Sequence, residues 1–225
     1  AQRAEKVVSI ELDERLLAVL KETLIDFSNV KVIHGDALKT DIKQLINDEF
    51  KGMETLVCAN LPYYITSPLI MRFLEEHIPV TSLTVMVQKE AAARLCAEPG
   101  SRDCGAVSAV IHYYSKPNVL FKVPRSCFYP QPNVDSAVIK LNILEKPPVN
   151  VIDEKTFFSV VKAAFCRRRK TILNSVSGGL NIDKKLLSSC FDEAGIKASL
   201  RAEQLTMNDF AALSNILFRN RRLIN

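Results

Sequence analysis

The chain has 225 residues and a formal net charge of +5, with 48% hydrophobic and 24% charged residues. These fractions are typical of globular proteins and exclude a disordered, collagen-like or coiled-coil chain. No window approaches the ~18 consecutive apolar residues of a membrane-spanning helix, so we expect no membrane partner. Glycine is scarce, with seven residues, and the first is Gly35. No glycine-rich phosphate loop therefore opens the chain.

Short apolar runs alternate with amphipathic stretches over the first two thirds of the chain. We expect strands at 7–12, 30–33, 56–59 and 83–87, helices at 13–24, 40–49 and 89–97, and one more helix with Ser67 as its N-cap and Pro68 at its first position. Strands that alternate with helices predict βαβ units and a mainly parallel sheet covered on both faces. The expected fold class is α/β.

The pattern changes after Pro99 and Gly100. We expect a helix at 105–114, then an antiparallel pair of strands, 119–123 and 134–141, at one edge of the sheet. Apolar residues then recur at helical spacing over 157–176, 184–194 and 206–217. Gly178 and Gly179 are expected to close the first of these helices, and Thr206 to cap the last. We predict two domains, 1–146 and an all-helical 147–225.

Charge is distributed unevenly between these two parts. Residues 1–150 hold 17 basic and 18 acidic side chains, net −1, whereas residues 151–225 hold 13 and 7, net +6. Such asymmetry indicates an anionic partner for the C-terminal part, although a solvated basic surface explains the charge equally well.

The six cysteines show no metal-binding spacing, and the chain has only three histidines, so we expect no metal site. Cys58 lies in an apolar run and Cys166 follows one, as buried, reduced thiols do. Reduced thiols in a chain with a sizeable core predict an intracellular, cytoplasmic protein.

Three polar residues, Glu11, Asp36 and Asn60, stand at or just after the ends of successive predicted strands. In open α/β sheets ligands bind beyond the carboxyl ends of the strands. An acid there accepts hydrogen bonds from ribose hydroxyls, and an Asp in a Gly-Asp-Ala turn accepts one from an adenine amino group while backbone N–H groups near Ala37 meet ring nitrogens. Taken singly, Glu11 and Asp36 are explained as well by helix capping.

The segment Asn60-Leu61-Pro62-Tyr63 carries the most specific chemistry. A purine amine is a poor nucleophile because its lone pair is delocalised into the ring. Two fixed acceptors, the side-chain carbonyl of Asn60 and the main-chain carbonyl of Leu61, would accept hydrogen bonds from both N–H groups of the amine. The rigid Pro62 would keep the Leu61 carbonyl accessible. Tyr63 offers a ring on which an extracted base can stack. The segment thus predicts catalysis by positioning and electrostatics.

Four stretches resemble one family of enzymes. They are Val-Ile-His-Gly-Asp-Ala-Leu (32–38), Asn-Leu-Pro-Tyr-Tyr-Ile-Thr-Ser-Pro (60–68), Val-Gln-Lys-Glu (87–90) and Phe-Tyr-Pro-Gln-Pro-Asn-Val-Asp-Ser-Ala-Val (128–138). They are similar to the RNA adenine N6-dimethyltransferases, above all to the bacterial small-subunit ribosomal enzymes. The resemblance implies a Rossmann-like class I methyltransferase sheet, S-adenosylmethionine as methyl donor, and two adjacent adenosines near the 3′ end of 16S rRNA as target, bound by a monomer.

The resemblance also implies roles for individual residues. Glu11 would bind the cofactor ribose, Asp36 and Ala37 the cofactor adenine, and Asn60 would lie between cofactor and target base. Phe128 would stack on the side of that base opposite Tyr63. It is explained equally well as a core residue that anchors its loop.

A cluster of cations falls in the C-terminal part, at Arg167, Arg168, Arg169 and Lys170. It resembles the arginine-rich, RNA-contacting helix of the family's small C-terminal domain. Four consecutive residues span more than one helical turn, so some are expected to contact phosphate while at least one pairs with an acid or a helix end.

The sequence departs from the family pattern at its start. Family members carry a first strand and a glycine-rich cofactor turn before the residue matching Glu11, whereas this chain opens with Ala-Gln-Arg-Ala-Glu-Lys. We therefore expect the first strand to be missing from the sheet and cofactor binding to be weak. A non-catalytic, RNA-binding or small-subunit-binding form is the alternative function. A dinucleotide-dependent dehydrogenase is disfavoured because the chain lacks G-x-G-x-x-G.

Overall fold

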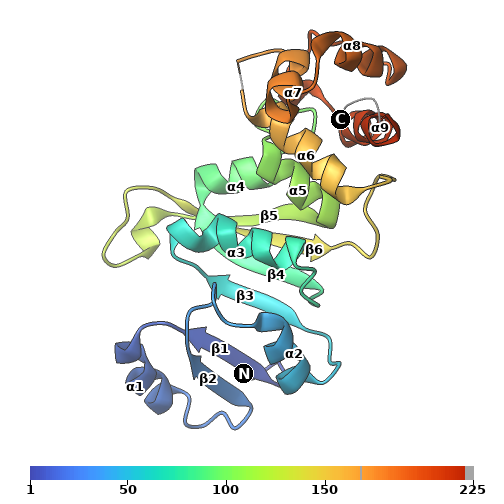
Figure 1. Ribbon diagram of the computed structural model, residues 1–225. Coiled ribbons are helices and arrows are strands. Elements are labelled where there is room, and N and C mark those ends of the chain that lie inside the picture. Colours follow the sequence, from blue (N-terminus) through green and yellow to red (C-terminus); the bar gives the residue numbers. More distant parts are fainter. Residues whose placement is uncertain (168, 221–225) are drawn as a thin grey trace. The chain divides into compact units, whose positions relative to one another are not determined.

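A computed structural model of the protein describes residues 1–167 and 169–220 (Figure 1). These residues divide into two compact units, the first from residue 1 to 83 and the second beginning at residue 84. The elements of the first unit are β1 (Val7–Glu11), α1 (Glu14–Thr23), β2 (Val30–His34), α2 (Ile42–Phe50), β3 (Leu56–Asn60) and α3 (Tyr63–Glu75). Those that follow are β4 (Ser82–Gln88), α4 (Lys89–Leu95), α5 (Ala106–Tyr114), β5 (Ser115–Val123), β6 (Ser136–Ile143), α6 (Glu154–Phe165), α7 (Ile172–Leu180), α8 (Lys184–Glu193) and α9 (Met207–Arg219).

In the first unit, β1 and β2 form a parallel pair in which Glu11 lies opposite His34. Among the described residues, β3 is hydrogen-bonded to neither strand of that pair. No hydrogen-bonded ladder therefore joins β1 to β3. This is the place in the sheet of the first strand that we expected to be missing.

An ion cluster ties α2 to the β1–β2 pair. The Glu49 carboxylate contacts the Lys6 ammonium at 2.7 Å and also the Lys31 ammonium. Hydrogen bonds from Lys31 and then Lys6 lower the pKa of Glu49 from 4.5 to about 2. A carboxyl group whose pKa is lowered in the folded state stabilises that state above its unfolded pKa and loses this effect as it becomes protonated.

This cluster predicts an acid-sensitive first unit. As pH falls from 4.5 towards 2, Glu49 becomes protonated and its contribution to the free energy of unfolding disappears. We expect Glu49→Gln to remove part of the fall in the urea midpoint over this pH range, measured by far-UV circular dichroism. Glu22→Gln, at an exposed position on α1, is the matched control. Identical pH profiles for Glu49→Gln and the wild type would contradict the prediction.

The helix after β3 begins earlier than the sequence predicted. We expected Ser67 as N-cap and Pro68 at the first position, but α3 begins at Tyr63 and contains Pro68 within it. The Pro62 carbonyl starts the helix by accepting hydrogen bonds from the Ile65 N–H and the Thr66 hydroxyl. Pro68 forgoes one helical hydrogen bond, and the helix continues because its buried face is extensive. That face comprises Leu69, Ile70, Phe73 and Leu74.

In the second unit, β4, β6 and β5 lie in this order, with β5 at the edge. β5 and β6 are antiparallel, which confirms the predicted edge pair. A β-bulge interrupts their register, since Val119 lies opposite Ile139 whereas Phe121 lies opposite Val138. The structure thus combines parallel and antiparallel pairs with helices in an α/β fold.

Helices α5 to α9 of the second unit share one hydrophobic core. Its largest fully buried side chains include Tyr113, Phe157, Phe191 and Phe210. Tyr113 belongs to α5, so this core recruits a helix from before the predicted boundary at residue 147. The division into domains 1–146 and 147–225 stays a prediction.

The predicted helix 157–176 is wrong in its extent, because two helices, α6 and α7, occupy this region. A turn separates them, in which the Arg167 carbonyl accepts hydrogen bonds from the Lys170 N–H and the Ser175 hydroxyl. Thr171 then caps α7. Gly178 and Gly179 lie inside α7 rather than after it. α7 ends instead at Asn181, in the left-handed conformation that Asn tolerates.

Gly179 is the point of closest approach between α6 and α7, and it predicts a sharp contrast with its neighbour. A Cβ at Gly179 would lie 2.6 Å from the Ala163 Cβ and 2.8 Å from its Cα, whereas a Cβ at Gly178 would meet the movable Arg167 guanidinium at 3.3 Å. We expect Gly179→Ala to lower the free energy of unfolding by about 1–3 kcal/mol through overpacking. Gly178→Ala gains helix propensity and should be neutral or stabilising. Urea titrations compare them, and equal stabilities would contradict this packing.

Cysteine burial differs from expectation. Cys58 and Cys166 are exposed rather than buried, whereas Cys104 and Cys190 are buried. Burial raises the pKa of the Cys104 thiol to about 11. All six cysteines are free thiols. No helix among the described residues has the length and apolar character needed to span a membrane.

Candidate functional site

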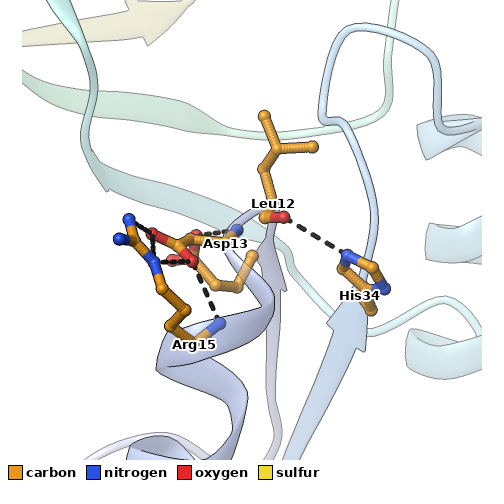
Figure 2. Close-up of polar contacts among 5 residues, drawn as sticks. Leu12, Asp13, Arg15 and His34 are labelled. Atoms are coloured by element: carbon orange, nitrogen blue, oxygen red, sulfur yellow. Dashed lines mark hydrogen bonds and ion pairs between the residues drawn. The ribbon is translucent and has the colours of Figure 1, made fainter.

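The carboxyl ends of β1 and β2 bring Glu11 and the Asp36 turn together. The ladder places Glu11 opposite His34, and the Gly35 N–H donates to the Glu11 carbonyl at 2.9 Å. The Glu11 Oε1 accepts the Asp13 N–H at 2.8 Å, while its Oε2 has no hydrogen-bond partner among the described residues. His34 Nε2 donates to the Leu12 carbonyl at 3.2 Å (Figure 2). One Glu11 oxygen thus fixes the side chain, and the other can accept a hydrogen bond from a ligand.

Helix capping does not explain Glu11 or Asp36. The N-cap of α1 is Asp13, whose carboxylate accepts the Arg15 N–H at 3.0 Å, and the N-cap of α2 is Asp41. The Arg15 guanidinium also binds the Asp13 carboxylate, at 2.6 Å from Nη2 to Oδ2 (Figure 2), and this hydrogen bond lowers the pKa of Asp13 to about 2. Both helices therefore have dedicated caps.

Asp36 organises a tight turn after β2. Its Oδ1 accepts the Leu38 N–H at 2.9 Å, and its main-chain carbonyl accepts the Thr40 N–H and hydroxyl, both at 2.9 Å. The Lys39 ammonium lies 3.7 Å from Oδ2. The side chain is half-buried, so this turn presents a fixed carboxylate at its surface.

Arg72 connects this turn to α3, a link that the sequence did not predict. Its Nη1 donates to the Ala37 carbonyl at 2.9 Å, and its Nε pairs with Glu76 at 3.1 Å. The only sequence signal was the i,i+4 spacing of Arg72 and Glu76, which is common on helix surfaces. Arg72 thus joins the turn after β2 to the helix that begins at Tyr63.

The segment from Asn60 to Tyr63 spans the end of β3 and the start of α3. Asn60 is the last residue of β3 and is exposed, and its side-chain amide makes no hydrogen bond with another described residue. α3 uses the Pro62 carbonyl as its first acceptor, so the Leu61 carbonyl lies before the helix. Tyr63 is 40% exposed. Two carbonyl acceptors and an aromatic ring therefore follow one another at the end of β3.

The remaining predicted residues lie in the second unit. Phe128 is half-buried and follows the 3-10 helix Arg125–Cys127. Arg167, Arg169 and Lys170 are exposed in the turn between α6 and α7, so the prediction that the cations stand on a helix is wrong for these three. Arg168 lies outside the described residues. No group of three or more potential metal ligands occurs among the residues that the structure describes.

The strand ends thus present two carboxylates, Glu11 and Asp36, each fixed by a main-chain N–H through one oxygen. Solved structures share this fold. A dimethyladenosine transferase from Plasmodium falciparum has a TM-score of 0.79 and 25% identity, over 97% of this chain and 83% of that one. A 23S rRNA methyltransferase shares the fold, with a TM-score of 0.71 and 23% identity over 96% and 84%.

The fold is that of a Rossmann-like methyltransferase. A relative from Alkaliphilus oremlandii, "Ribosomal RNA small subunit methyltransferase A", is 50% identical over 218 residues, which cover 96% of this chain and 76% of the relative. The family model described as "Ribosomal RNA adenine dimethylase" matches residues 1–218. The chain belongs to the ribosomal RNA adenine dimethylase family, whose members are enzymes.

Proposed function

We propose that the protein transfers methyl groups from S-adenosylmethionine to the N6 amines of two adjacent adenosines near the 3′ end of 16S rRNA. Family membership supports the reaction class. The single observation that carries the chemistry is the exposed Asn60 amide at the end of β3, directly before Pro62 and Tyr63. No observation favours the alternative of a non-catalytic RNA-binding protein.

The proposed mechanism works by hydrogen bonding and orientation. The Asn60 side-chain carbonyl and the Leu61 main-chain carbonyl accept the two N–H hydrogens of the adenine amine. This geometry directs the nitrogen lone pair outward, and the amine loses a proton to solvent after transfer. Tyr63 stacks against the extracted base, and Phe128 supplies the second wall. S-adenosylmethionine, when bound, supplies an electrophilic methyl group.

Cofactor recognition is assigned to the first unit. Glu11 accepts the ribose hydroxyls through its Oε2, while Asp36 and Ala37 recognise the adenine, and Asn60 lies between the two substrates. The strand ends that carry Glu11 and Asn60 are not joined by a common ladder among the described residues. Ordering them costs free energy on binding, so we expect weak cofactor binding by the 225-residue chain, measurable by calorimetry.

RNA binding is assigned to the exposed cations Arg167, Arg169 and Lys170, together with Arg168. Phosphate contacts of this kind supply affinity and salt dependence rather than sequence specificity. The proposed partner is the 16S rRNA of the small ribosomal subunit, met by a monomer in the cytoplasm, where that subunit is assembled.

Transfer of labelled methyl groups to unmethylated small subunits tests the proposal. We expect label in the two adjacent adenosines near the 3′ end, detected by nuclease mapping. Subunits that are already dimethylated are the matched control and should accept no label. Label at any other base, or none with saturating cofactor, would refute the proposed function.

A further inference from the structure

The edge strand of the second unit carries an exposed surface that the proposed function does not use. We call it the β5 edge surface, and it consists of the exposed side chains Lys116, Leu120, Phe121, Lys122 and Arg125. Phe121 is 58% exposed and Leu120 48% exposed. Large apolar side chains gathered with cations on an exposed edge indicate an interaction site.

The β-bulge determines where Phe121 points. Val119 lies opposite Ile139, which is fully buried, whereas Phe121 lies opposite the half-buried Val138. Residues opposite each other in an antiparallel pair share a face. In a regular strand without a bulge, Phe121 would stand two residues after Val119 and share its face. The bulge therefore turns an aromatic ring away from the core.

The same strand is protected against pairing with another strand. Exposed edge strands pair readily with other chains, and proteins prevent this with lysines, prolines and bulges. β5 has all three, in Lys116 and Lys122, in Pro117 without an N–H, and in the bulge at Leu120. A second copy of this chain would also bring the same positive charges into contact. The β5 edge surface is thus poorly suited to pairing with a strand of another protein or to contact with a second copy of this chain.

Its chemistry matches a single-stranded nucleic acid. Residues 115–134 contain three cations, Lys116, Lys122 and Arg125, and no Asp or Glu, and the next carboxylate in the chain, Asp135, accepts the main-chain N–H of Arg125 at 3.0 Å. Proteins that bind single strands combine cations, which follow the phosphates, with exposed aromatic rings on which bases stack. Lys116, like Phe121, shares its sheet face with half-buried β6 residues, because it lies opposite Asn142. Phe121 and Lys116 therefore share one face of the β5–β6 pair, whereas Lys122 lies opposite the buried Ala137 and stands on the other face of the same edge.

We infer that the β5 edge surface binds a single-stranded segment of the RNA substrate, with Phe121 stacking on a base and Lys116, Lys122 and Arg125 contacting phosphates. The choice of RNA rests on the proposed function. This surface is separate in sequence from the Arg167–Lys170 cations, and it leads directly into the loop that carries Phe128.

The test measures binding of a fluorescent single-stranded RNA of about ten nucleotides to the full chain by anisotropy. The variants are Phe121→Ala, Phe121→Tyr and the double variant Lys122→Ala with Arg125→Ala. The matched control is Val119→Ala, which removes a similarly exposed apolar side chain without a ring. Circular dichroism verifies that each variant is folded, and inorganic polyphosphate serves as a base-free competitor.

We expect Phe121→Ala to weaken RNA binding about tenfold, the order of one base stack, and to leave polyphosphate binding unchanged. Phe121→Tyr should restore affinity, and Val119→Ala should change it less than twofold. The double variant should lower the slope of log affinity against log salt by about 0.7 per cation removed.

Two results would overturn the inference. One is unchanged RNA affinity in Phe121→Ala, and the other is self-association of the wild type that Phe121→Ala abolishes. Methyl transfer assayed on the same samples separates this inference from the proposed function. A wild type that methylates, with Phe121→Ala binding RNA normally, refutes the inference alone. Phe121-dependent RNA binding without methyl transfer refutes only the proposed function.

Discussion

Replacing Asn60 with Ala is expected to slow methyl transfer by about 100- to 1000-fold, because it removes one of two acceptors aimed at the adenine amine. That factor corresponds to about 2.7–4 kcal/mol of transition-state stabilisation. Asn60 is exposed and makes no hydrogen bond with another described residue, so its removal should leave the fold intact. Single-turnover transfer of labelled methyl groups to unmethylated small subunits measures the effect.

Asn47→Ala is the matched control for this experiment. Asn47 is likewise exposed in the first unit, on α2, at a position without an assigned role. Its variant should methylate at the wild-type rate. RNA affinity measured in parallel should be the same for both variants, because the Asn60 acceptor acts on the reacting amine. Wild-type turnover by Asn60→Ala would refute the assigned chemistry.

The second large effect is expected from Phe157→Ala, which should lower the free energy of unfolding by about 3–5 kcal/mol. Phe157 is fully buried in the core of the second unit, and its ring centroid lies 4.9 Å from that of Tyr113. Truncation to Ala leaves a cavity and also removes this aromatic contact. The chain has no Trp, so urea titrations followed by far-UV circular dichroism are the appropriate measurement.

Two neighbouring variants make this prediction specific. Phe157→Leu keeps most of the buried volume and should cost less than about 1.5 kcal/mol. Phe158→Ala removes a ring from the next position on α6, where the side chain is only half-buried, so its effect should be smaller than that of Phe157→Ala. Equal losses for Phe157→Ala and Phe158→Ala would mean that burial does not determine stability here.

Sequence reasoning predicted elements well where local signals agreed with one another. β1, β2 and α1 follow from hydrophobic alternation and spacing, and Thr206 caps α9 as expected. The predicted start of α3 at Pro68 was wrong. Proline is common at the first position of a helix, but here burial of the α3 face outweighs the one hydrogen bond that Pro68 cannot make. Sequence reasoning was also wrong at the α6–α7 turn. There the apolar spacing continues through the turn, whereas the structure has two separate helices that approach each other closely at Ala163 and Gly179.

The candidate site was predictable to the extent that it is local. Glu11, Asp36 and Asn60 could be placed because each ends a strand, and strand ends follow from the apolar pattern. Arg72 could not be found this way, because its contact with the Ala37 carbonyl joins residues 35 positions apart in the chain. The bulge that orients Phe121 was equally hidden, since register is a property of two strands rather than one.

The hydrogen bond from Arg72 to the Ala37 carbonyl has a thermodynamic consequence. It joins the turn assigned to the cofactor adenine to the helix whose first residue is assigned to the target base. We expect a displacement of either element to be transmitted to the other, so the two substrates should alter each other's affinity. By linkage the factor is the same in both directions. The order in which cofactor and RNA arrive therefore changes the route to the ternary complex but not its stability.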